Sequence, residues 1–233
     1  MIDKETCSRI GLFGGTFNPI HLGHLRAAEE VLEALDLDRV IFIPSAIPPH
    51  KPADPLDPIA DADQRLDWVE RATAGHKRFS VDRIEMDRPG ASFLIDTLEA
   101  LRDREFKSRR VFIVGEDAFS EMGDWKAPKR LFTMTDFAVM TRPPSRMRGI
   151  EEFIPDVVRK DFEFSEQGRV ATHLVAGTRI EMVPITALDI SSSQIRKAQR
   201  EGRSIRYVVP ESIRGAIEKS RCYVPNNGNL LDE

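Results

Sequence analysis

The sequence predicts an α/β fold built on a parallel β-sheet, and three observations lead to this prediction. Short apolar runs alternate with amphipathic stretches along the chain, which is typical of repeated β-α-β units. Several of these runs end at glycine or proline, as strands do where they pass into loops. Of the 233 residues, 41% are hydrophobic and 31% are charged, with a net charge of −4, so the chain can form a sizeable core. This composition excludes fibrous, collagenous and disordered classes.

Five short apolar runs are expected to form the buried strands of the sheet. They span residues 10–13, 40–43, 111–114, 137–140 and 180–183. Two shorter extended segments, at residues 79–81 and 84–86, are expected between the second and third of these strands.

Helices are expected between the strands and near the end of the chain. In residues 24–35, for example, the apolar side chains recur at steps of three and four, which places them on one helical face. The other expected helices span residues 63–74, 95–102, 194–201 and 210–221. Residues 145–180 have many charges and few periodic apolar positions, so we expect loop or irregular helix there before the last strand.

The chain has no internal repeat or low-complexity tract, and we expect a single domain over residues 1–233. Its ordered core is expected over about residues 10–221, with residues 222–233 as a tail. No apolar run reaches the roughly 18 residues of a membrane span and no secretory leader is visible, so a cytoplasmic location and no membrane partner are expected. An isoelectric point near 5.8, without a long basic run, argues against nucleic acid as a partner.

Only two cysteines are present, Cys7 and Cys222. One lies near each end of the sequence, so they build no disulfide framework and give no metal-ligand spacing. We interpret both as reduced thiols.

The ligand site is expected beyond the carboxyl ends of the strands. In open parallel sheets, ligands bind in the crevice at that edge. The strand ends after Phe13, Ile43, Val114 and Met140 should therefore border one crevice.

The first of these strand ends carries features of a phosphate site. Gly14 and Gly15 follow the strand, and adjacent glycines let backbone N–H groups approach an anion without obstruction by Cβ atoms. His21 and His24 lie three residues apart where the first helix begins, so both imidazoles project from one face toward the same loop. The glycine spacing matches neither a dinucleotide fingerprint nor a P-loop, and the two histidines lack a third zinc ligand nearby. A histidine pair that only caps the helix remains the structural alternative.

Two motifs resemble the nucleotidylyltransferase superfamily. Residues 14–24 read Gly-Gly-Thr-Phe-Asn-Pro-Ile-His-Leu-Gly-His, which is similar to the signature of that superfamily with its His-x-Gly-His element. Residues 190–196 read Ile-Ser-Ser-Ser-Gln-Ile-Arg and resemble its triphosphate-binding motif. Local physics agrees, because Ser191 or Ser192 can cap the following helix and Arg196 offers a fork of donors to phosphate oxygens.

Three further segments resemble the bacterial nicotinate-nucleotide adenylyltransferases within this superfamily. They are residues 43–51, which contain Pro-Pro-His-Lys, residues 88–98, and Gly-Glu-Asp at residues 115–117 followed by Trp125. The resemblance spans about residues 10–221. It implies a Rossmann-like, doubly wound parallel sheet with helices on both faces and a small C-terminal helical portion.

The resemblance also implies the activity. The enzyme would transfer the adenylyl group of ATP to nicotinate mononucleotide, giving nicotinate adenine dinucleotide and pyrophosphate in NAD biosynthesis. ATP and nicotinate mononucleotide would be its partners, and a homo-oligomer is left open. Mg²⁺ would arrive with ATP and be held through phosphate oxygens and water, because no carboxylate cluster accompanies the motifs and no protein metal site is expected.

Site residues carry over from the family position by position. His21 and His24 would hold the α- and β-phosphates, the helix start at Ser192 and Ser193 together with Arg196 would hold pyrophosphate, and Lys51 would add positive charge. The residues expected to bind ATP are Gly14, Gly15, Thr16, Phe17, Asn18, His21, His24, Gly115, Asp117, Ile190, Ser192, Ser193 and Arg196. Those expected to bind nicotinate mononucleotide are Ser45, His50, Lys51, Phe93, Leu94, Ile95, Trp125 and Arg142, with backbone N–H groups of residues 93–95 on the carboxylate and Trp125 stacked near the ring.

Three positions depart from the family pattern. Asn18 stands where Asp is commoner, Phe93 replaces Tyr, and Leu94 replaces Thr and so removes a hydroxyl from the segment near the nicotinate. The alternative functions are another nucleotidylyltransferase, with nicotinamide mononucleotide, phosphopantetheine, or a sugar or glycerol phosphate as acceptor, and a non-catalytic nucleotide-binding regulator of the same fold. Taken alone, Trp125 would be a packing residue.

Overall fold

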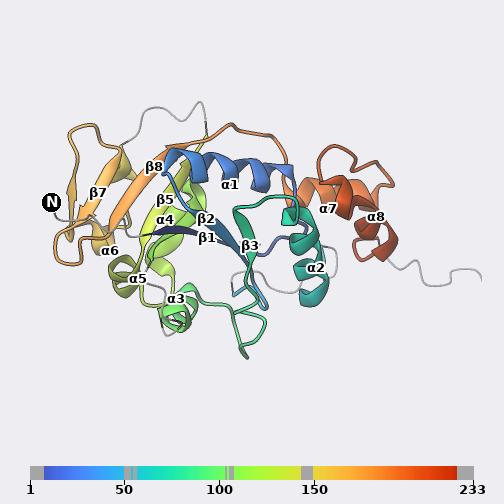
Figure 1. The fold of residues 1–233 in the computed structure, drawn as a ribbon, viewed down its shortest axis with the longest axis horizontal. Helices are drawn as coiled ribbons and strands as arrows, with labels where there is room; N and C mark the ends of the chain where they lie inside the picture. The colour runs from blue at the N-terminus through green and yellow to red at the C-terminus, as the bar shows by residue number, and fades with distance from the viewer. Residues whose placement is uncertain are drawn as a thin grey trace, which may run out of the picture.

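The computed structural model describes residues 8–49, 54, 57–102, 104, 108–142 and 149–224. Its centre is a twisted eight-stranded sheet with helices packed around it (Figure 1). In spatial order the strands are β3 (Phe79–Val81), β2 (Arg39–Pro44), β1 (Arg9–Gly15), β4 (Arg109–Gly115), β5 (Asp136–Thr141), β8 (Arg179–Pro184), β7 (Val170–His173) and β6 (Phe162–Phe164). The six strands from β3 to β8 pair in parallel, whereas β7 and β6 pair antiparallel.

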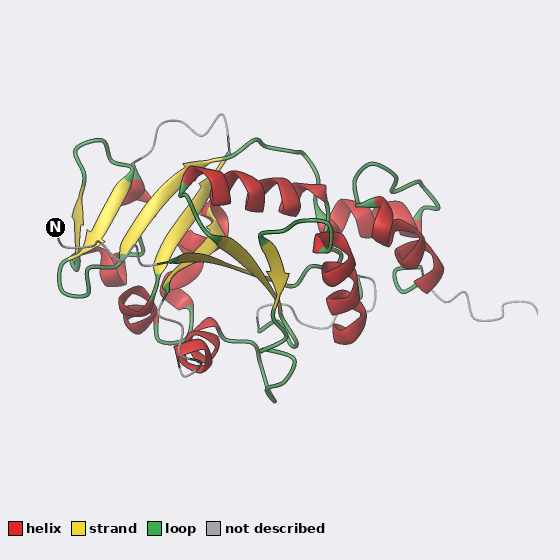
Figure 2. Cartoon of the chain, viewed as in Figure 1, coloured by secondary structure: helices red, strands yellow, loops and turns green. Residues whose placement is uncertain are grey.

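Helices cover both faces of the sheet. They are α1 (Leu22–Ala34), α2 (Ala62–Thr73), α3 (Leu94–Arg102), α4 (Glu116–Ser120), α5 (Pro128–Met134), α6 (Asp156–Arg159), α7 (Ser192–Arg200) and α8 (Glu211–Ser220), with 3-10 turns η1 (Glu121–Asp124) and η2 (Ile150–Glu152). Helix α1 packs on one face, and α3 and α5 lie on the other (Figure 2). Helices α2, α7 and α8 gather at one end of the molecule, beyond β3 (Figure 1). The predicted doubly wound α/β fold and its small C-terminal helical portion are confirmed.

Burial explains why these segments take up their structures. In α1 the buried residues Ala27, Ala28, Val31 and Leu32 form one stripe that faces the sheet. Helix α2 begins where Asp61 accepts hydrogen bonds from two backbone N–H groups of its first turn. The central strands are buried on both faces, as parallel strands between helical layers are, which is why they read as continuous apolar runs in the sequence.

Two expectations about the fold are wrong. Residues 145–180 do not form only loop and irregular helix, because the described part from residue 149 contains the antiparallel strands β6 and β7 and two short helical segments. These strands have three and four residues, too few for an apolar run to stand out. Residues 84–86 form a turn, not a strand, in which the Asp82 carboxylate accepts from the N–H of Ile84.

Strand β1 marks the point where the order of the sheet reverses. The chain passes from β1 to β2 and β3 on one side, and then crosses to β4 and β5 on the other. A crevice opens at such a switch point, beyond the carboxyl ends of the strands. Gly14 and Gly15 end β1 and Gly115 ends β4, so the predicted motif lies at this crevice.

Among the described residues, no helix is both long and apolar enough to cross a membrane. Cys222 carries a free thiol, and Cys7 lies outside the described residues.

Candidate functional site

Two cavities open at the carboxyl ends of β1 and β4. The first, which we call the aromatic cavity, has a volume of about 310 Å³ and includes Phe93, Trp125 and Lys126 in its lining. The second, which we call the histidine cavity, has a volume of about 270 Å³ and includes His21 and His24. Phe13 lines the histidine cavity and Gly14 lines the aromatic cavity, and successive strand residues face opposite sides of a sheet. The end of β1 therefore separates two neighbouring chambers.

The histidine pair is built by the first turn of α1. His21 precedes the helix in an extended conformation, and its N–H donates to Nδ1 of His24 at 3.3 Å. The two rings lie against each other with centroids 3.7 Å apart. A Cβ at Gly23 would come within 3.0 Å of the His21 ring, so the glycine between the two histidines makes room for this packing. Contacts among His21, Gly23 and His24 therefore fix the local structure of this motif.

His21 is neutral at physiological pH. Its side chain is buried, and this burial, with the positive charge of Arg142 as a smaller cause, lowers its pKa from 6.5 to about 4. Its Nδ1 is buried without a hydrogen-bond partner among the described residues. His24 accepts a hydrogen bond at Nδ1, so in its neutral form it carries its proton on Nε2. Both imidazoles can therefore donate one hydrogen bond without carrying a full charge.

The start of α7 forms another wall of the histidine cavity. Ser191 and Gln194 cap the helix reciprocally, with the Gln194 N–H donating to Ser191 Oγ at 3.2 Å and the Ser191 N–H donating to Gln194 Oε1 at 2.9 Å. The Ser192 hydroxyl donates to the Pro19 carbonyl at 2.9 Å and so fastens α7 to residues 14–19, which we call the glycine loop. The N-termini of α1 and α7 thus both border the histidine cavity, where their dipoles favour an anion.

Arg196 does not line either cavity. Its guanidinium is buried, donates to both carboxylate oxygens of Asp57, and also donates to the Asn18 carbonyl at 2.9 Å and to Ser193 Oγ at 3.1 Å. Arg200 donates to the same carboxylate at 2.8 Å. The hydrogen bonds from Arg196 are the largest cause that holds the pKa of Asp57 far below its usual range. In this conformation Arg196 holds the backbone of the glycine loop. A phosphate could bind the Arg196 guanidinium only if the Asp57 carboxylate moved away.

Asn18 belongs to the same buried support. Its side-chain oxygen accepts from the Tyr223 hydroxyl at 2.6 Å and from the Ala60 N–H at 3.0 Å, and its amide donates to the Pro58 carbonyl at 3.1 Å. An aspartate at this position could accept the first two hydrogen bonds but could not donate the third. The need to donate to the Pro58 carbonyl therefore explains why Asn stands at position 18 instead of Asp. Asn18 contacts neither cavity.

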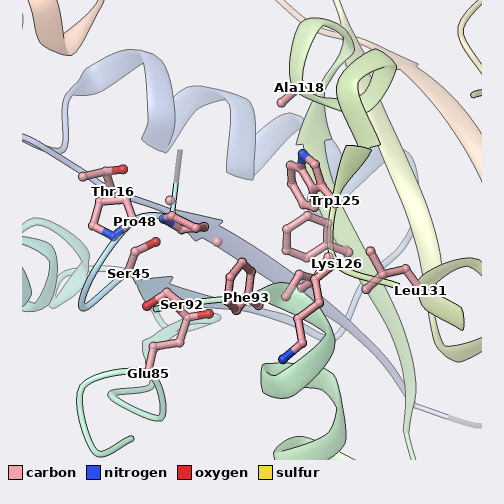
Figure 3. Close-up of a pocket in the computed structure, with 15 residues that line it drawn as sticks. Thr16, Ser45, Pro48, Glu85, Ser92, Phe93, Ala118, Trp125, Lys126 and Leu131 are labelled. Atoms are coloured by element: carbon pink, nitrogen blue, oxygen red, sulfur yellow. The ribbon is translucent and has the colours of Figure 1, made fainter. Parts of the chain in front are cut away.

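The aromatic cavity is formed by loops from several parts of the chain. Figure 3 shows Trp125 and Phe93 beside the hollow, with Thr16 and Ser45 on another side. Lys126 lies with Nζ 4.9 Å from the centre of the Phe93 ring and 2.8 Å from a carboxylate oxygen of Asp96. The cavity thus combines ring faces with an ammonium group.

The start of α3 borders the aromatic cavity. The N–H of Phe93 already donates to the Ala91 carbonyl at 3.0 Å, which corrects the expectation that this N–H is available to a carboxylate. Leu94 and Ile95 open α3, and within the described chain neither N–H has a hydrogen-bond acceptor. The Ile95 side chain is buried in the core, so only its backbone can contribute. Two donors remain for an anion.

A buried carboxyl, Glu85, lies at the base of the aromatic cavity. Burial raises its pKa, and it accepts from the Thr97 hydroxyl at 2.6 Å. Ser92 Oγ accepts from the N–H groups of Ala46 and Ile47 at 3.0 and 3.4 Å. These contacts join residues 45–49, which we call the β2 loop, to the segment before α3.

The structure divides the predicted residues among these places. The histidine cavity is lined by His21, His24, Gly115, Asp117, Ile190 and Ser192, all expected to bind ATP, and by Arg142, expected to bind the mononucleotide. The aromatic cavity is lined by Ser45, Phe93, Leu94 and Trp125, expected to bind the mononucleotide, and by Gly14, Gly15 and Thr16, expected to bind ATP. Neither cavity includes Phe17, Asn18, Ile95, Ser193 or Arg196, and His50 and Lys51 lie outside the described residues.

Arg142 lines a different cavity from Ser45, Phe93, Leu94 and Trp125, with which it was grouped in the expected site. It follows β5, which pairs with β4, and its positive charge is one cause of the lowered pKa of His21. Its guanidinium charge therefore acts on the histidine cavity and not on the aromatic one.

Sequence reasoning missed Lys126, Glu85 and Arg65. Lys126 lies in a polar stretch of the sequence, which indicates only an exposed charge. Glu85 and Arg65 lie in stretches that predict a short extended segment and an ordinary helix. In the sequence, the only indication that Lys126 belongs to the site is its position next to Trp125.

Comparisons with known proteins identify the family of this chain. The family model described as Cytidylyltransferase-like matches residues 12–198. A protein of Pelobacter propionicus named "Probable nicotinate-nucleotide adenylyltransferase" is 40% identical over 215 residues, covering 92% of this chain and 98% of its own length. A protein of Trichlorobacter lovleyi with the same name is 42% identical over 217 residues, covering 93% and 100%.

A solved structure shares the fold. It is that of Plasmodium falciparum nicotinic acid mononucleotide adenylyltransferase complexed with NaAD, with a TM-score of 0.69 at 14% sequence identity, covering 93% of this chain and 97% of that one. At this identity the likeness concerns the arrangement of the chain.

Proposed function

The chain belongs to the nicotinate-nucleotide adenylyltransferases of the cytidylyltransferase-like family, and we propose that its two cavities divide the reaction of that family between them. The reaction transfers the adenylyl group of ATP to nicotinate mononucleotide in NAD biosynthesis and releases pyrophosphate. The observation that carries the division is that one wall, the end of β1, separates a chamber of imidazoles and helix N-termini from a chamber of aromatic rings. Residues 1–233 then act as one nucleotidylyltransferase domain.

The histidine cavity suits ATP. His21 offers a neutral N–H donor, His24 offers a second ring N–H, and the N-termini of α1 and α7 add partial positive charge, which together favour the α- and β-phosphates. Arg142 contributes a full positive charge at the rim. Gly115, which ends β4, and Asp117, in α4, line the same cavity, and their proposed role is to contact the nucleoside.

The aromatic cavity suits nicotinate mononucleotide. Trp125 and Phe93 supply ring faces for the pyridine, and the N–H groups of Leu94 and Ile95 supply donors for its carboxylate. Lys126 adds positive charge close to Phe93. A carboxylate fits this donor set, whereas the NH₂ of an amide would meet donors and leave them unpaired.

The chemistry needs no covalent enzyme intermediate. An oxygen of the nicotinate mononucleotide phosphate attacks the α-phosphorus of ATP, a new P–O bond forms, and the bond from that phosphorus to the pyrophosphate oxygen breaks. The attacking phosphate is ionised at neutral pH, so it needs no general base. The protein aligns the two phosphates and stabilises charge on the oxygens that gain it. His21 and His24 do this through hydrogen bonds that strengthen in the transition state.

The site fits a metal carried by the nucleotide. Among the described residues, no group of three His, Cys, Asp or Glu side chains could hold a metal ion. Mg²⁺ would therefore be bound through ATP oxygens and water, and it would neutralise phosphate charge there. Lys51 remains a predicted further source of positive charge.

Pyrophosphate release tests the function directly. The purified chain is incubated with Mg²⁺-ATP and, in parallel, nicotinate mononucleotide, nicotinamide mononucleotide or phosphopantetheine. We expect a strong signal with the nicotinate substrate and a weak one with its amide. A stronger signal with either other acceptor would refute the assignment of the aromatic cavity. ATP binding without turnover on any acceptor would instead point to a nucleotide-binding regulator.

A further inference from the structure

Arg65 is a buried guanidinium with no role in the mechanism described so far. It lies on α2 with 1% of its surface exposed. It donates to four backbone carbonyls, those of Ala60 at 2.9 Å, Thr16 and Ser45 at 2.7 Å each, and Ala46 at 3.1 Å. One side chain therefore joins the glycine loop, the β2 loop and the segment before α2.

The segment that Arg65 holds is strained. Phe17 has a φ angle of 46°, in the left-handed region that side chains with a Cβ seldom adopt. Its ring packs so closely against the backbone that a Cβ at Gly15 would lie 3.1 Å from it. Strained residues persist only where their surroundings fix them. Here these surroundings include the rings packed around Phe17 and the hydrogen bond from Arg65 to the preceding carbonyl, that of Thr16.

This contact also sets the direction of a donor. The C=O and N–H groups of a trans peptide point in opposite directions, so an Arg65 that binds the Thr16 carbonyl turns the Phe17 N–H away from itself. Within the described chain no acceptor is hydrogen bonded to that N–H. The Phe17 N–H belongs to the peptide between Thr16 and Phe17. This peptide follows the end of β1, which is the wall between the two cavities.

Arg65 also brings charge. All four of its hydrogen bonds go to neutral carbonyls and none to a carboxylate. A buried cation that is not neutralised by an ion pair polarises the peptides it binds and raises the electrostatic potential on their far side. In the proposed function, two anionic phosphates meet on that side.

We propose that Arg65 is a positioning residue for adenylyl transfer. It fixes the glycine loop and the β2 loop relative to each other, and it presents the Phe17 N–H to the reacting phosphates. This inference rests on the proposed function, because it assumes that phosphates meet at the end of β1.

The test compares Arg65→Met, which removes the donors, with Arg65→Lys, which keeps the charge but binds fewer carbonyls. Arg71→Met is the matched control, since Arg71 lies on the same helix with an exposed side chain paired to Asp67. Steady-state kinetics for both substrates, thermal melting, and calorimetric binding of ATP and of adenosine are measured for each. A 1 Å error in alignment costs about 100-fold in rate, so we expect kcat/KM of Arg65→Met to fall about 100-fold, with Arg65→Lys between it and the wild type.

The binding data separate positioning from general damage. We expect Arg65→Met to weaken ATP binding about tenfold while adenosine binding stays within twofold of the wild type, since adenosine has no phosphate. A folded Arg65→Met enzyme with unchanged kcat/KM and ATP binding would overturn the inference, as would equal losses for ATP and adenosine. If Arg65→Met does not fold, Arg65→Lys decides the matter, and wild-type kinetics in that variant would overturn it.

The same data distinguish the two proposals. If the wild type binds ATP but turns over no acceptor, the proposed function fails. The loss of ATP relative to adenosine binding in Arg65→Met then still tests the inference about Arg65.

Discussion

The two cavities share a wall but are built in different ways. The histidine cavity contains residues of two short motifs, each of which forms the start of a helix, and burial lowers the pKa of its His21 imidazole. The aromatic cavity draws on the glycine loop, the β2 loop, the start of α3 and the segment around Trp125, and it combines rings with the charged groups Lys126 and Glu85. The contact between the two histidines is thus set locally, whereas the rest of the histidine cavity and the whole of the aromatic cavity are assembled by the tertiary fold. Substitutions in the histidine cavity should reduce turnover on every acceptor, whereas substitutions in the aromatic cavity should change which acceptor is used.

The largest effect is expected in the histidine cavity. His24→Ala removes a donor to the phosphates, and loss of one such donor costs on the order of 10²–10³ in kcat. We expect a fall of about 10³ in kcat, with the KM for nicotinate mononucleotide changed less than threefold, measured by pyrophosphate release. His76→Ala, which removes an imidazole paired with Glu29 on the surface, is the control and should leave kcat unchanged. A His24→Ala enzyme that keeps most of its turnover would contradict the proposed role of His24 as a donor to the phosphates.

The second effect concerns the neutrality of His21. Its pKa is about 4 in the folded protein against 6.5 ordinarily, so between these values the unfolded chain binds a proton that the folded chain does not. As the pH falls from 6.5 to 4, the free energy of unfolding should therefore decrease, by about 3 kcal/mol from this group. Urea denaturation of the wild type and of His21→Gln at several pH values measures this.

The variant is the control in that experiment. His21→Gln cannot take up the proton, so its stability should fall less over the same range. Parallel curves for the two proteins would show that His21 titrates normally and carries charge near pH 6.

The contrast between the cavities explains what the sequence could predict. The strands around residues 111–114 and 137–140 are buried on both faces, so their apolar runs alone identified them. The proximity of His21 and His24 could be predicted because both lie at the start of one helix, whereas Ser192 reaches the same cavity only through the tertiary fold. Helices α1 and α2 were predicted within two residues of their observed ends because each has its own periodicity, whereas the short helices α4 and α5 were not predicted.

What was missed depends on contacts between distant segments. Arg196 matches a motif, yet its orientation is decided by Asp57, 139 residues away. Arg142 lies on the histidine cavity because of the order of strands in the sheet, which no local pattern encodes. Lys126 and Glu85 acquire their roles only when α3 and the β2 loop come together. The short strands β6 and β7 were missed because they only extend an edge of the sheet.

In the aromatic cavity, Trp125→Ala should affect one substrate. Stacking of a base on an aromatic side chain is worth about 1–3 kcal/mol, so we expect the KM for nicotinate mononucleotide to rise about 10- to 100-fold. The KM for ATP, measured in the same titrations, should stay within twofold, because Trp125 does not line the histidine cavity. Equal increases in both KM values would mean that Trp125 supports the whole site instead of one half.

The smallest expected effect comes from Lys126, and it bears on acceptor choice. Its ammonium is half exposed and already paired with Asp96, so its attraction for the nicotinate carboxylate should be worth no more than about 1 kcal/mol. Lys126→Met should therefore lower kcat/KM for nicotinate mononucleotide about fivefold and leave the value for nicotinamide mononucleotide nearly unchanged, since the amide carries no charge to attract. Added salt should shrink the difference between the wild type and the variant. Lys129→Met, a nearby exposed lysine that lines neither cavity, controls for the change in net charge. If Lys126→Met lowered kcat/KM equally for both acceptors, the ammonium would act by fixing Phe93 and α3, and the choice of the acid over the amide would rest on the backbone N–H groups alone.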